Sequence, residues 1–270
     1  MPIDKNRNED TAQGERLQSA LSHRGVCSRR HAADLIASGV VSVNGKVVLE
    51  RGFRVNPATD EIRVSGKLLP KEEEEPHTIL LYKPRGVICS ADNSRGETVC
   101  DLMREEFSER LVPVGRLDKD TEGLLLMSND GEFCKLMTHP RYGCVKIYQA
   151  RVAGHMTEEK LRILRSRMEI DGYLIRPVVV EVIRIGDNHV HRLQFTLTEG
   201  RNRQIRKMCE IAGFTVLELK RVRIGPLRIG KMEPGDWREL SLTEVESLKR
   251  HARAIERAAQ QPEPPRRRRR

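Results

Sequence analysis

The sequence lacks long hydrophobic runs. Its longest apolar stretches, such as Ile79 to Tyr82 and Leu124 to Met127, fall far below the roughly 20 residues that a membrane-spanning helix needs. The first residues are polar throughout, so no signal peptide is expected. The 6 cysteines are scattered singly, without the paired spacing of a zinc site or of a disulfide framework. These absences predict a cytoplasmic protein with reduced thiols, no membrane contact and no metal.

Acidic residues are too few to balance the basic ones. The formal net charge is +10, and 5 of the positive charges lie in the closing RRRRR run. A basic excess of this size indicates a polyanionic partner, with nucleic acid the obvious class. We expect residues 259–270 to form a Pro/Arg-rich basic tail that adds unspecific affinity for phosphates. A solubilising end without a further role is the alternative.

The amino-terminal part of the chain predicts a small domain at 15–70, after a disordered segment at 1–14. Two short amphipathic helices are expected between Arg16 and Ile36, the second capped by Ser28. The following VVSVNGKVV places Asn44-Gly45 between alternating apolar residues, the strongest short-range signal for a β-hairpin. Two further short strands would complete this unit.

The stretch RLQSALSHRGVCSRRHAADLIASGVVSVNGKVV resembles the α-L RNA-binding domain first described in a small-subunit ribosomal protein, and the likeness covers about 17–64. In that family the two helices and the hairpin loop bind structured RNA. The resemblance therefore implies RNA contacts from Arg24, Arg29, Arg30 and Lys46. A solvated basic face is the alternative, although two arginines in the first turn of a helix are unfavourable without an anionic partner.

A linker is expected at 71–77, where prolines flank consecutive glutamates, and a second domain at 78–258. The hydrophobic pattern of this domain predicts an α+β fold with a large, mostly antiparallel sheet. A last helix, at about 244–258, is expected to open with the capping box Thr243-x-x-Glu246. Strands are expected near 79–82, 86–90, 123–128, 145–152, 178–184, 190–198 and 214–220, and helices near 98–105, 131–138, 157–168 and 202–212.

The segment VPVGRLDKDTEGLLLMSNDGEF carries the most chemical information. It places Arg116 and Asp118 in a loop between two apolar strands, where a carboxylate is held rigidly and stays exposed. Local chemistry leaves three interpretations of Asp118 open. It could be a reactive carboxylate, it could cap a turn, or it could bind a divalent ion together with Asp120.

Four segments of this domain are similar to the RNA pseudouridine synthases of the RsuA/RluB branch, which act on ribosomal RNA. They are LYKPRGVICS, GRLDKDTEGLL, KIYQARV and TEGRNRQIRKMCEIAGFTVLELKRVRIGPL. With the first domain, the likeness spans about 17–247. It implies a pseudouridine synthase fold, in which helices flank a large mixed sheet. It also implies an enzyme without a cofactor that isomerises a uridine of ribosomal RNA to pseudouridine.

Carried over by position, the resemblance makes Asp118 the nucleophile, Tyr148 the residue that packs on the target uracil, and Arg206 the ion-pair partner of the aspartate. Arg116 would support the flipped nucleotide, because a base inside an RNA helix must leave the stack to be modified. Phosphate contacts are expected from Lys83, Arg203 and Lys207.

Details of two segments, GRNRQIRKM and LYKPRGVI, resemble the large-subunit enzymes more than the small-subunit one. We therefore expect a monomer that modifies 23S rRNA, with 16S rRNA as the alternative target. A non-catalytic RNA-binding factor of ribosome assembly is a second alternative, and a metal-dependent RNA hydrolase that uses Asp118 and Asp120 is a third.

Overall fold

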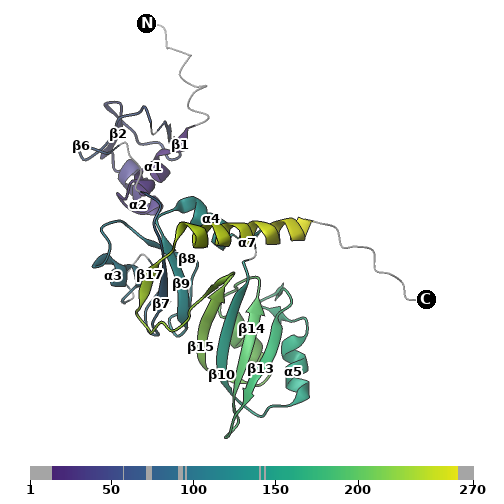
Figure 1. The fold of residues 1–270 in the computed structure, drawn as a ribbon. Coiled ribbons are helices and arrows are strands. Elements are labelled where there is room, and N and C mark those ends of the chain that lie inside the picture. The colour runs from purple at the N-terminus through teal and green to yellow at the C-terminus, as the bar shows by residue number, and fades with distance from the viewer. Residues whose placement is uncertain are drawn as a thin grey trace. The chain divides into compact units, whose positions relative to one another are not determined.

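The structure is a computed structural model that describes residues 14–56, 58–70, 75–90, 94, 96–139, 141–142 and 144–260, with side chains up to 257. The chain divides into two compact units, Met1–Pro76 and His77–Arg270 (Figure 1). The predicted disorder of 1–14 and the predicted basic tail at 259–270 fall almost entirely outside the described residues.

The first unit contains the two expected helices and the expected hairpin. Helix α2 (Arg29–Ala37) begins where the Ser28 side chain accepts a hydrogen bond of 3.2 Å from the backbone N–H of His31. Asn44 and Gly45 both have positive φ, 51° and 76°, as a tight hairpin turn requires. The remaining elements are α1 (Leu17–His23), β1 (Glu15–Arg16), β2 (Val41–Val43), β3 (Lys46–Val47), β4 (Arg54–Val55), β5 (Ile62–Val64) and β6 (Lys67–Leu68).

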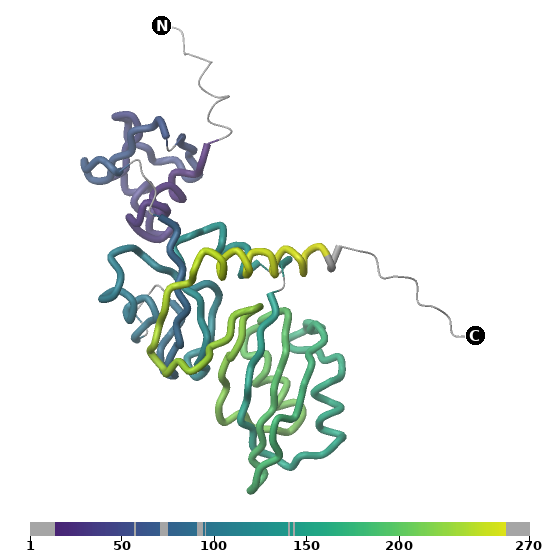
Figure 2. The backbone as a smooth tube through the Cα atoms, viewed as in Figure 1, coloured from purple at the N-terminus to yellow at the C-terminus, as the bar shows by residue number. Residues whose placement is uncertain are grey.

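The second unit is built on a mixed sheet of nine strands, and its main path runs β13-β14-β10-β15-β9-β7-β17. Among the described strands of this sheet, β9 and β15 form the one parallel pair, so the sheet is mostly antiparallel, as expected. Figure 2 shows these two strands side by side, although they are far apart in the sequence. The strands are β7 (Thr78–Lys83), β8 (Val112–Val114), β9 (Glu122–Ser128), β10 (Lys146–Ala153), β13 (Val179–Ile185), β14 (Val190–Leu197), β15 (Thr215–Ile224), β16 (Leu227–Arg228) and β17 (Trp237–Glu239). A separate short hairpin joins β11 (Glu169–Ile170) to β12 (Tyr173–Leu174).

Helices cover the sheet on both faces where its strands are apolar throughout. Strand β7 is buried at every position, because it packs on both faces. Leu80 lies in one hydrophobic cluster with residues of α4 (Gly131–Thr138) and α7 (Leu242–Gln260). Leu81 lies in another cluster, with residues of α3 (Val99–Arg104). At the other end of the sheet, α5 (Glu158–Arg165) and α6 (Gln204–Ile211) cover β10 and β14. Figure 1 shows α5 beside β13 and β14. Within the described residues, none of the helices combines the length and apolar composition needed to span a membrane.

Two local expectations are wrong. The residues at 86–90 form no strand, because Gly86 turns the chain at a φ of 94° and only Ile88 makes an isolated bridge, to Thr98. The capping box of α7 lies two residues earlier than predicted. Ser241 Oγ accepts from the backbone N–H of Glu244 at 3.3 Å, and the Glu244 carboxylate accepts from the backbone N–H of Ser241 at 3.0 Å.

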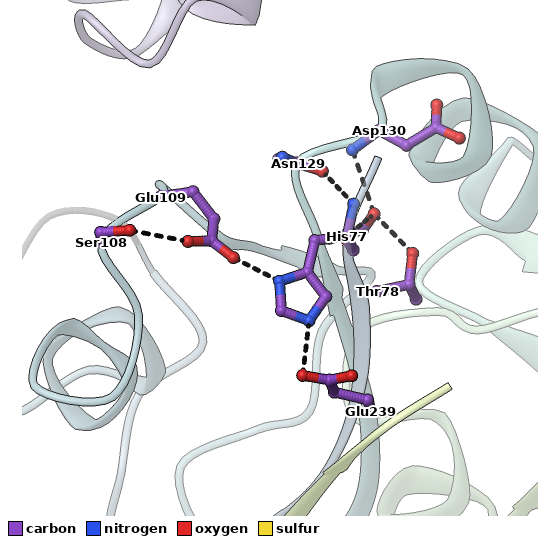
Figure 3. A network of polar contacts seen from close by, with 8 residues as sticks. His77, Thr78, Ser108, Glu109, Asn129, Asp130 and Glu239 are labelled. Carbon is purple, nitrogen blue, oxygen red and sulfur yellow. Dashed lines mark hydrogen bonds and ion pairs between the residues drawn. The ribbon is translucent and has the colours of Figure 1, made fainter. Parts of the chain in front are cut away.

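The start of β7 is fixed by a network around His77 (Figure 3). Its backbone N–H donates to Asn129 Oδ1 at 2.7 Å, and Ser128 Oγ donates to its carbonyl at 2.8 Å. Its ring contacts two carboxylates, Glu109 through Nδ1 and Glu239 through Nε2 at 3.5 Å. The hydrogen bond from His77 lowers the pKa of Glu109. This network ties the entry of the second unit to the loop before β8 and to β17.

Candidate active site

Asp118 lies on the loop between β8 and β9, in the place that the sequence predicts. Gly115 begins the loop at a φ of 83°, which glycine adopts without a steric penalty. The side chain of Leu117 is buried, and its backbone N–H donates to Cys89 Sγ at 3.3 Å. The carbonyl of Asp118 accepts from Thr121 N at 3.0 Å. The loop therefore presents a half-buried carboxylate from a backbone that is fixed on both sides.

Lys83 supports this loop from inside the protein, which corrects the expectation of a phosphate contact. Its side chain is 0% exposed, so an RNA phosphate cannot reach it. The ammonium group instead donates to the carbonyls of Pro84 and Thr121, each at 2.8 Å, and to that of Lys119 at 3.4 Å. Burial lowers the pKa of Lys83, and nearby Cys89 and Asp118 oppose this shift. The buried ammonium group of Lys83 thus holds the Asp118 loop in place.

Arg206 holds the same loop from α6, but it makes no ion pair with Asp118 among the described residues. Its guanidinium donates to two backbone carbonyls, that of Asp120 at 3.1 Å and that of Val216 at 3.3 Å. In place of the predicted ion pair, Arg206 thus binds the carbonyl of Asp120, two residues after Asp118 on the loop, and the carbonyl of Val216 on β15. Burial lowers the pKa of Arg206, and the charges of Asp120 and Asp118 partly oppose this shift. Its attraction to Asp118 acts at longer range than an ion pair.

Tyr148 lies on β10, where a register shift between Ile147 and Tyr148 places it opposite Arg221 of β15. The side chain of Arg221 is only 2% exposed. It donates to the carbonyl of Leu124 at 2.7 Å and to the hydroxyl of Tyr148 at 3.3 Å. Arg221 was not predicted from the sequence as a site residue. Its only sequence signal is a basic residue within the apolar strand pattern VLELKRVRI.

Asp118 and Tyr148 line one shallow cavity of about 80 Å³. The expected nucleotide support, Arg116, lines it as well and is exposed. Thr121 is 2% exposed, and its hydroxyl oxygen has no hydrogen-bond partner in the described part of the chain. The other walls include Leu197, Glu199, Gly200, Arg201, Arg203, Gln204, Ile205 and Leu219. An acidic group, a phenol and exposed cations thus meet at one opening.

The two further cations predicted on α6 differ in their availability. Arg203 is exposed and occupies the N-cap position of α6 at a φ of 51°, without a side-chain capping hydrogen bond. Its guanidinium lies 4.0 Å from Asp120 Oδ2. Lys207 makes an ion pair with Asp171 in the turn between β11 and β12. Arg203 therefore faces the cavity, whereas Lys207 fastens α6 to the neighbouring hairpin. In the described ranges, no group of three or more His, Cys, Asp or Glu side chains could hold a metal ion.

In the first unit, the predicted RNA-binding residues cluster on the second helix and the hairpin. Arg29 and Arg30 are exposed in the first turn of α2, which contains no acidic residue. Lys46 is exposed beside the hairpin turn, and Arg24, next to the carboxyl end of α1, is half-buried. Arg29 and Arg30 stand where the N–H groups at the start of α2 already attract anions.

A carboxylate, a tyrosine and exposed arginines lie around one opening of a mixed sheet, and a small unit with exposed arginines at a helix start precedes it in the chain. This combination defines an enzyme that acts on nucleic acid. The comparisons with known proteins specify the class. The family model described as RNA pseudouridylate synthase matches residues 77–211, and the S4 domain model matches residues 15–62. The chain belongs to the RNA pseudouridylate synthase family and carries an amino-terminal S4 RNA-binding domain.

Relatives agree with this assignment along most of the chain. The Ribosomal large subunit pseudouridine synthase B of Bacillus subtilis is 42% identical over 236 residues, which cover 87% of this chain and 96% of that protein. An Uncharacterized RNA pseudouridine synthase of Aquifex aeolicus is 37% identical, over 86% of this chain and 93% of its own length. A crystal structure of a pseudouridylate synthase superposes with a TM-score of 0.62 at 28% identity, over 86% of this chain and 99% of that one. The expected α+β fold and enzyme class are thereby confirmed.

Proposed function

We propose that this protein converts one specific uridine of 23S rRNA to pseudouridine, acting as a monomer in the cytoplasm. The observation that carries the proposal is the meeting of Asp118 and Tyr148 at one cavity in a chain of this family. Relatives that bear the name of a large-subunit enzyme support the choice of 23S over 16S rRNA. The basic face of the S4 domain supports ribosomal RNA as the partner.

The isomerisation breaks the N1–C1′ bond of the uridine and forms a C5–C1′ bond, while C5 loses a proton and N1 gains one. Asp118 is the group placed to act on the nucleotide while its base is detached, since it is the only carboxylate of its loop that lines the cavity. Tyr148 packs against the detached uracil and limits its movement while it turns. Lys83 and Arg206 hold the Asp118 loop by its carbonyls, so the carboxylate needs no reorganisation.

The target base must leave the RNA stack to reach this cavity. Arg116 is exposed at the opening and precedes Asp118 by two positions. Its planar guanidinium can stack in the space that the base vacates. The exposed Arg203 contacts the phosphates on the opposite wall.

The decisive test of the chemistry is Asp118→Asn, with Asp187→Asn as the matched control. Both aspartates sit in loops before a strand, and both accept a backbone hydrogen bond from the residue three positions later, at 3.0 Å for Asp118 and 3.1 Å for Asp187. We expect Asp118→Asn to abolish pseudouridine formation and leave RNA affinity within about twofold, because only the reactive carboxylate is lost. Retained modification by this variant, or equal loss in the control, would contradict the proposed mechanism.

The target is tested by mapping pseudouridines across ribosomal RNA in cells with and without this protein. We expect a single 23S site to disappear, and loss of a 16S site instead would overturn the choice of substrate.

The S4 domain is tested by deleting residues 1–76. That deletion should weaken RNA binding, because it removes the exposed cations of α2 and the hairpin. Unchanged affinity would mean that these cations do not touch RNA.

A further inference from the structure

A second cavity, of about 430 Å³, adjoins the active-site cavity, and we call it the basic pocket. Its walls come from the end of α4, the start of β10, the hairpin turn near Tyr173 and the loop between β14 and α6. Glu199, Gly200 and Arg201 line both cavities. The two cavities therefore border the same loop. The proposed isomerisation leaves the basic pocket without a role.

Three cations face the basic pocket: Lys146, Arg176 and Arg201. Glu199 is the only carboxylate among its lining residues. One oxygen of that carboxylate accepts from the backbone N–H of Arg176 at 2.7 Å and from the Gln204 amide at 3.4 Å. Glu199 thus fixes the loop between β14 and α6 to Arg176 and Gln204. The lining of the basic pocket therefore keeps an excess of positive charge.

Lys146 is the least solvated of these cations. Its ammonium group donates to the carbonyl of Cys144 at 3.0 Å, and the described chain offers it no carboxylate within ion-pair distance. An ammonium carries three donors, so two remain for a ligand. Burial lowers the pKa of Lys146, as expected for a cation that lacks an anionic partner. An anion in the pocket would supply that partner.

Arg201 is held in place before any ligand arrives. Its guanidinium carbon lies 3.2 Å from the centre of the Tyr173 ring, and its backbone N–H donates to Gln204 Oε1 at 3.0 Å. A stacked guanidinium keeps its edge free for a bidentate contact, and phosphate oxygens match that edge. Because Arg201 also borders the active-site cavity, an anion bound beside it lies next to the target nucleotide.

We propose that the basic pocket binds a backbone phosphate of the RNA strand next to the target uridine, an inference that rests on the proposed function. The pocket fixes the register of the strand, so that one particular uridine reaches Asp118. Its cations select an anionic group, and the loop wall that it shares with the active-site cavity places that group on the same strand as the target uridine.

The first test measures the affinity of the full chain for a single-stranded oligouridylate at several salt concentrations, which requires no catalysis. Lys146→Met should lower the salt dependence by about 0.7 in log–log slope for each lost phosphate contact. Arg162→Gln, a change at an exposed arginine of α5, is the control and should leave the slope unaltered. Arg176→Gln is the second pocket variant, because its side chain is exposed and its replacement does not endanger folding. An unchanged slope in a folded pocket variant, or no binding by the wild type, overturns the proposal.

The second test locates the phosphate. In a synthetic RNA hairpin that carries the mapped uridine, single linkages near that uridine are replaced one at a time by neutral methylphosphonates. One replacement should weaken wild-type binding at least about tenfold, because it removes a charge-assisted hydrogen bond. The same replacement should cost Lys146→Met almost nothing further. Equal losses in both proteins at every linkage would refute the phosphate site.

If the wild type forms no pseudouridine at all, the proposed function fails. The oligouridylate measurement would still decide whether the basic pocket binds a phosphate.

Discussion

The guanidinium of Arg221 donates through Nη1 to the hydroxyl of Tyr148 across 3.3 Å and through Nε to the carbonyl of Leu124 across 2.7 Å. Its Nη2 is buried and has no partner in the described part of the chain. An unpaired buried donor is costly, so its retention beside a cavity suggests a role in positioning. Arg221 connects Tyr148 to the backbone of β9, the strand that follows the Asp118 loop.

Arg221→Lys should lower kcat by about tenfold to a hundredfold with little change in KM, because a lysine keeps the charge but cannot reach both acceptors. The positioning role of Arg221 is tested in a double-mutant cycle with Tyr148→Phe, which removes only the hydroxyl. If Arg221 acts through that hydroxyl, adding Arg221→Lys to Tyr148→Phe should reduce kcat little further. Fully additive losses would show that Arg221 acts independently of the tyrosine.

Gly123 permits the parallel contact between β9 and β15, and its replacement should destabilise the protein strongly. A Cβ at this position would lie 2.3 Å from the carbonyl oxygen of Arg221, and the φ of 106° is strained for any other residue. Gly123→Ala should therefore lower the free energy of unfolding by about 3 kcal/mol or more. Gly172→Ala is the control, since its φ of 73° is also positive but its Cβ would meet nothing within 4 Å. That change should cost about 1 kcal/mol. Urea titrations compare the two, and equal losses would show that the contact with β15 does not matter.

Lys83→Met should destabilise the protein by about 3 kcal/mol, because it leaves the buried carbonyl of Thr121 and the part-buried carbonyls of Pro84 and Lys119 without their charged donor. Lys119→Met removes an exposed cation from the same loop and should change stability by less than about 0.5 kcal/mol. Thermal and urea unfolding measure both variants. At a temperature where Lys83→Met stays folded, its kcat should fall more than its RNA affinity. A variant as stable and active as the wild type would show that Lys83 does not hold the loop.

Most of the longer helices and strands could be predicted from the sequence, because periodicity and capping residues act locally, whereas the strand expected at 86–90 does not form and the short β11–β12 hairpin was not predicted. The hairpin at Asn44-Gly45 and the loop that carries Asp118 are formed by neighbouring residues, and both lie where the pattern places them. The roles of Lys83 and Arg221 could not be predicted in this way. Each is buried by a segment distant in the sequence: Lys83 by the carbonyls of Lys119 and Thr121, Arg221 by the pairing of β15 with β9.

The start of α7 shows a second reason why local patterns fall short. Ser241-x-x-Glu244 and Thr243-x-x-Glu246 both fit the capping-box pattern, so the sequence alone does not choose between them. The choice depends on Arg238 of β17, which binds both carboxylate oxygens of Glu244, at 2.7 Å and 3.0 Å. A tertiary contact thereby fixes which serine or threonine begins the helix.

This contact predicts an acid-dependent loss of stability. The hydrogen bond from Arg238 lowers the pKa of Glu244 from 4.5 to about 2. A carboxylate whose pKa is lower in the folded state stabilises the protein above the unfolded pKa, and that stabilisation is lost as the pH falls from about 4.5 to about 2.

Glu244→Gln should lower the free energy of unfolding by about 1 kcal/mol at pH 7 and flatten the decline of stability between pH 4.5 and pH 2. Glu246→Gln, at the alternative capping position, is the control and should change stability by less than about 0.5 kcal/mol, because its carboxylate is 59% exposed. Urea unfolding from pH 7 down to pH 2 measures both variants. A larger effect at Glu246 than at Glu244 would place the capping box at Thr243.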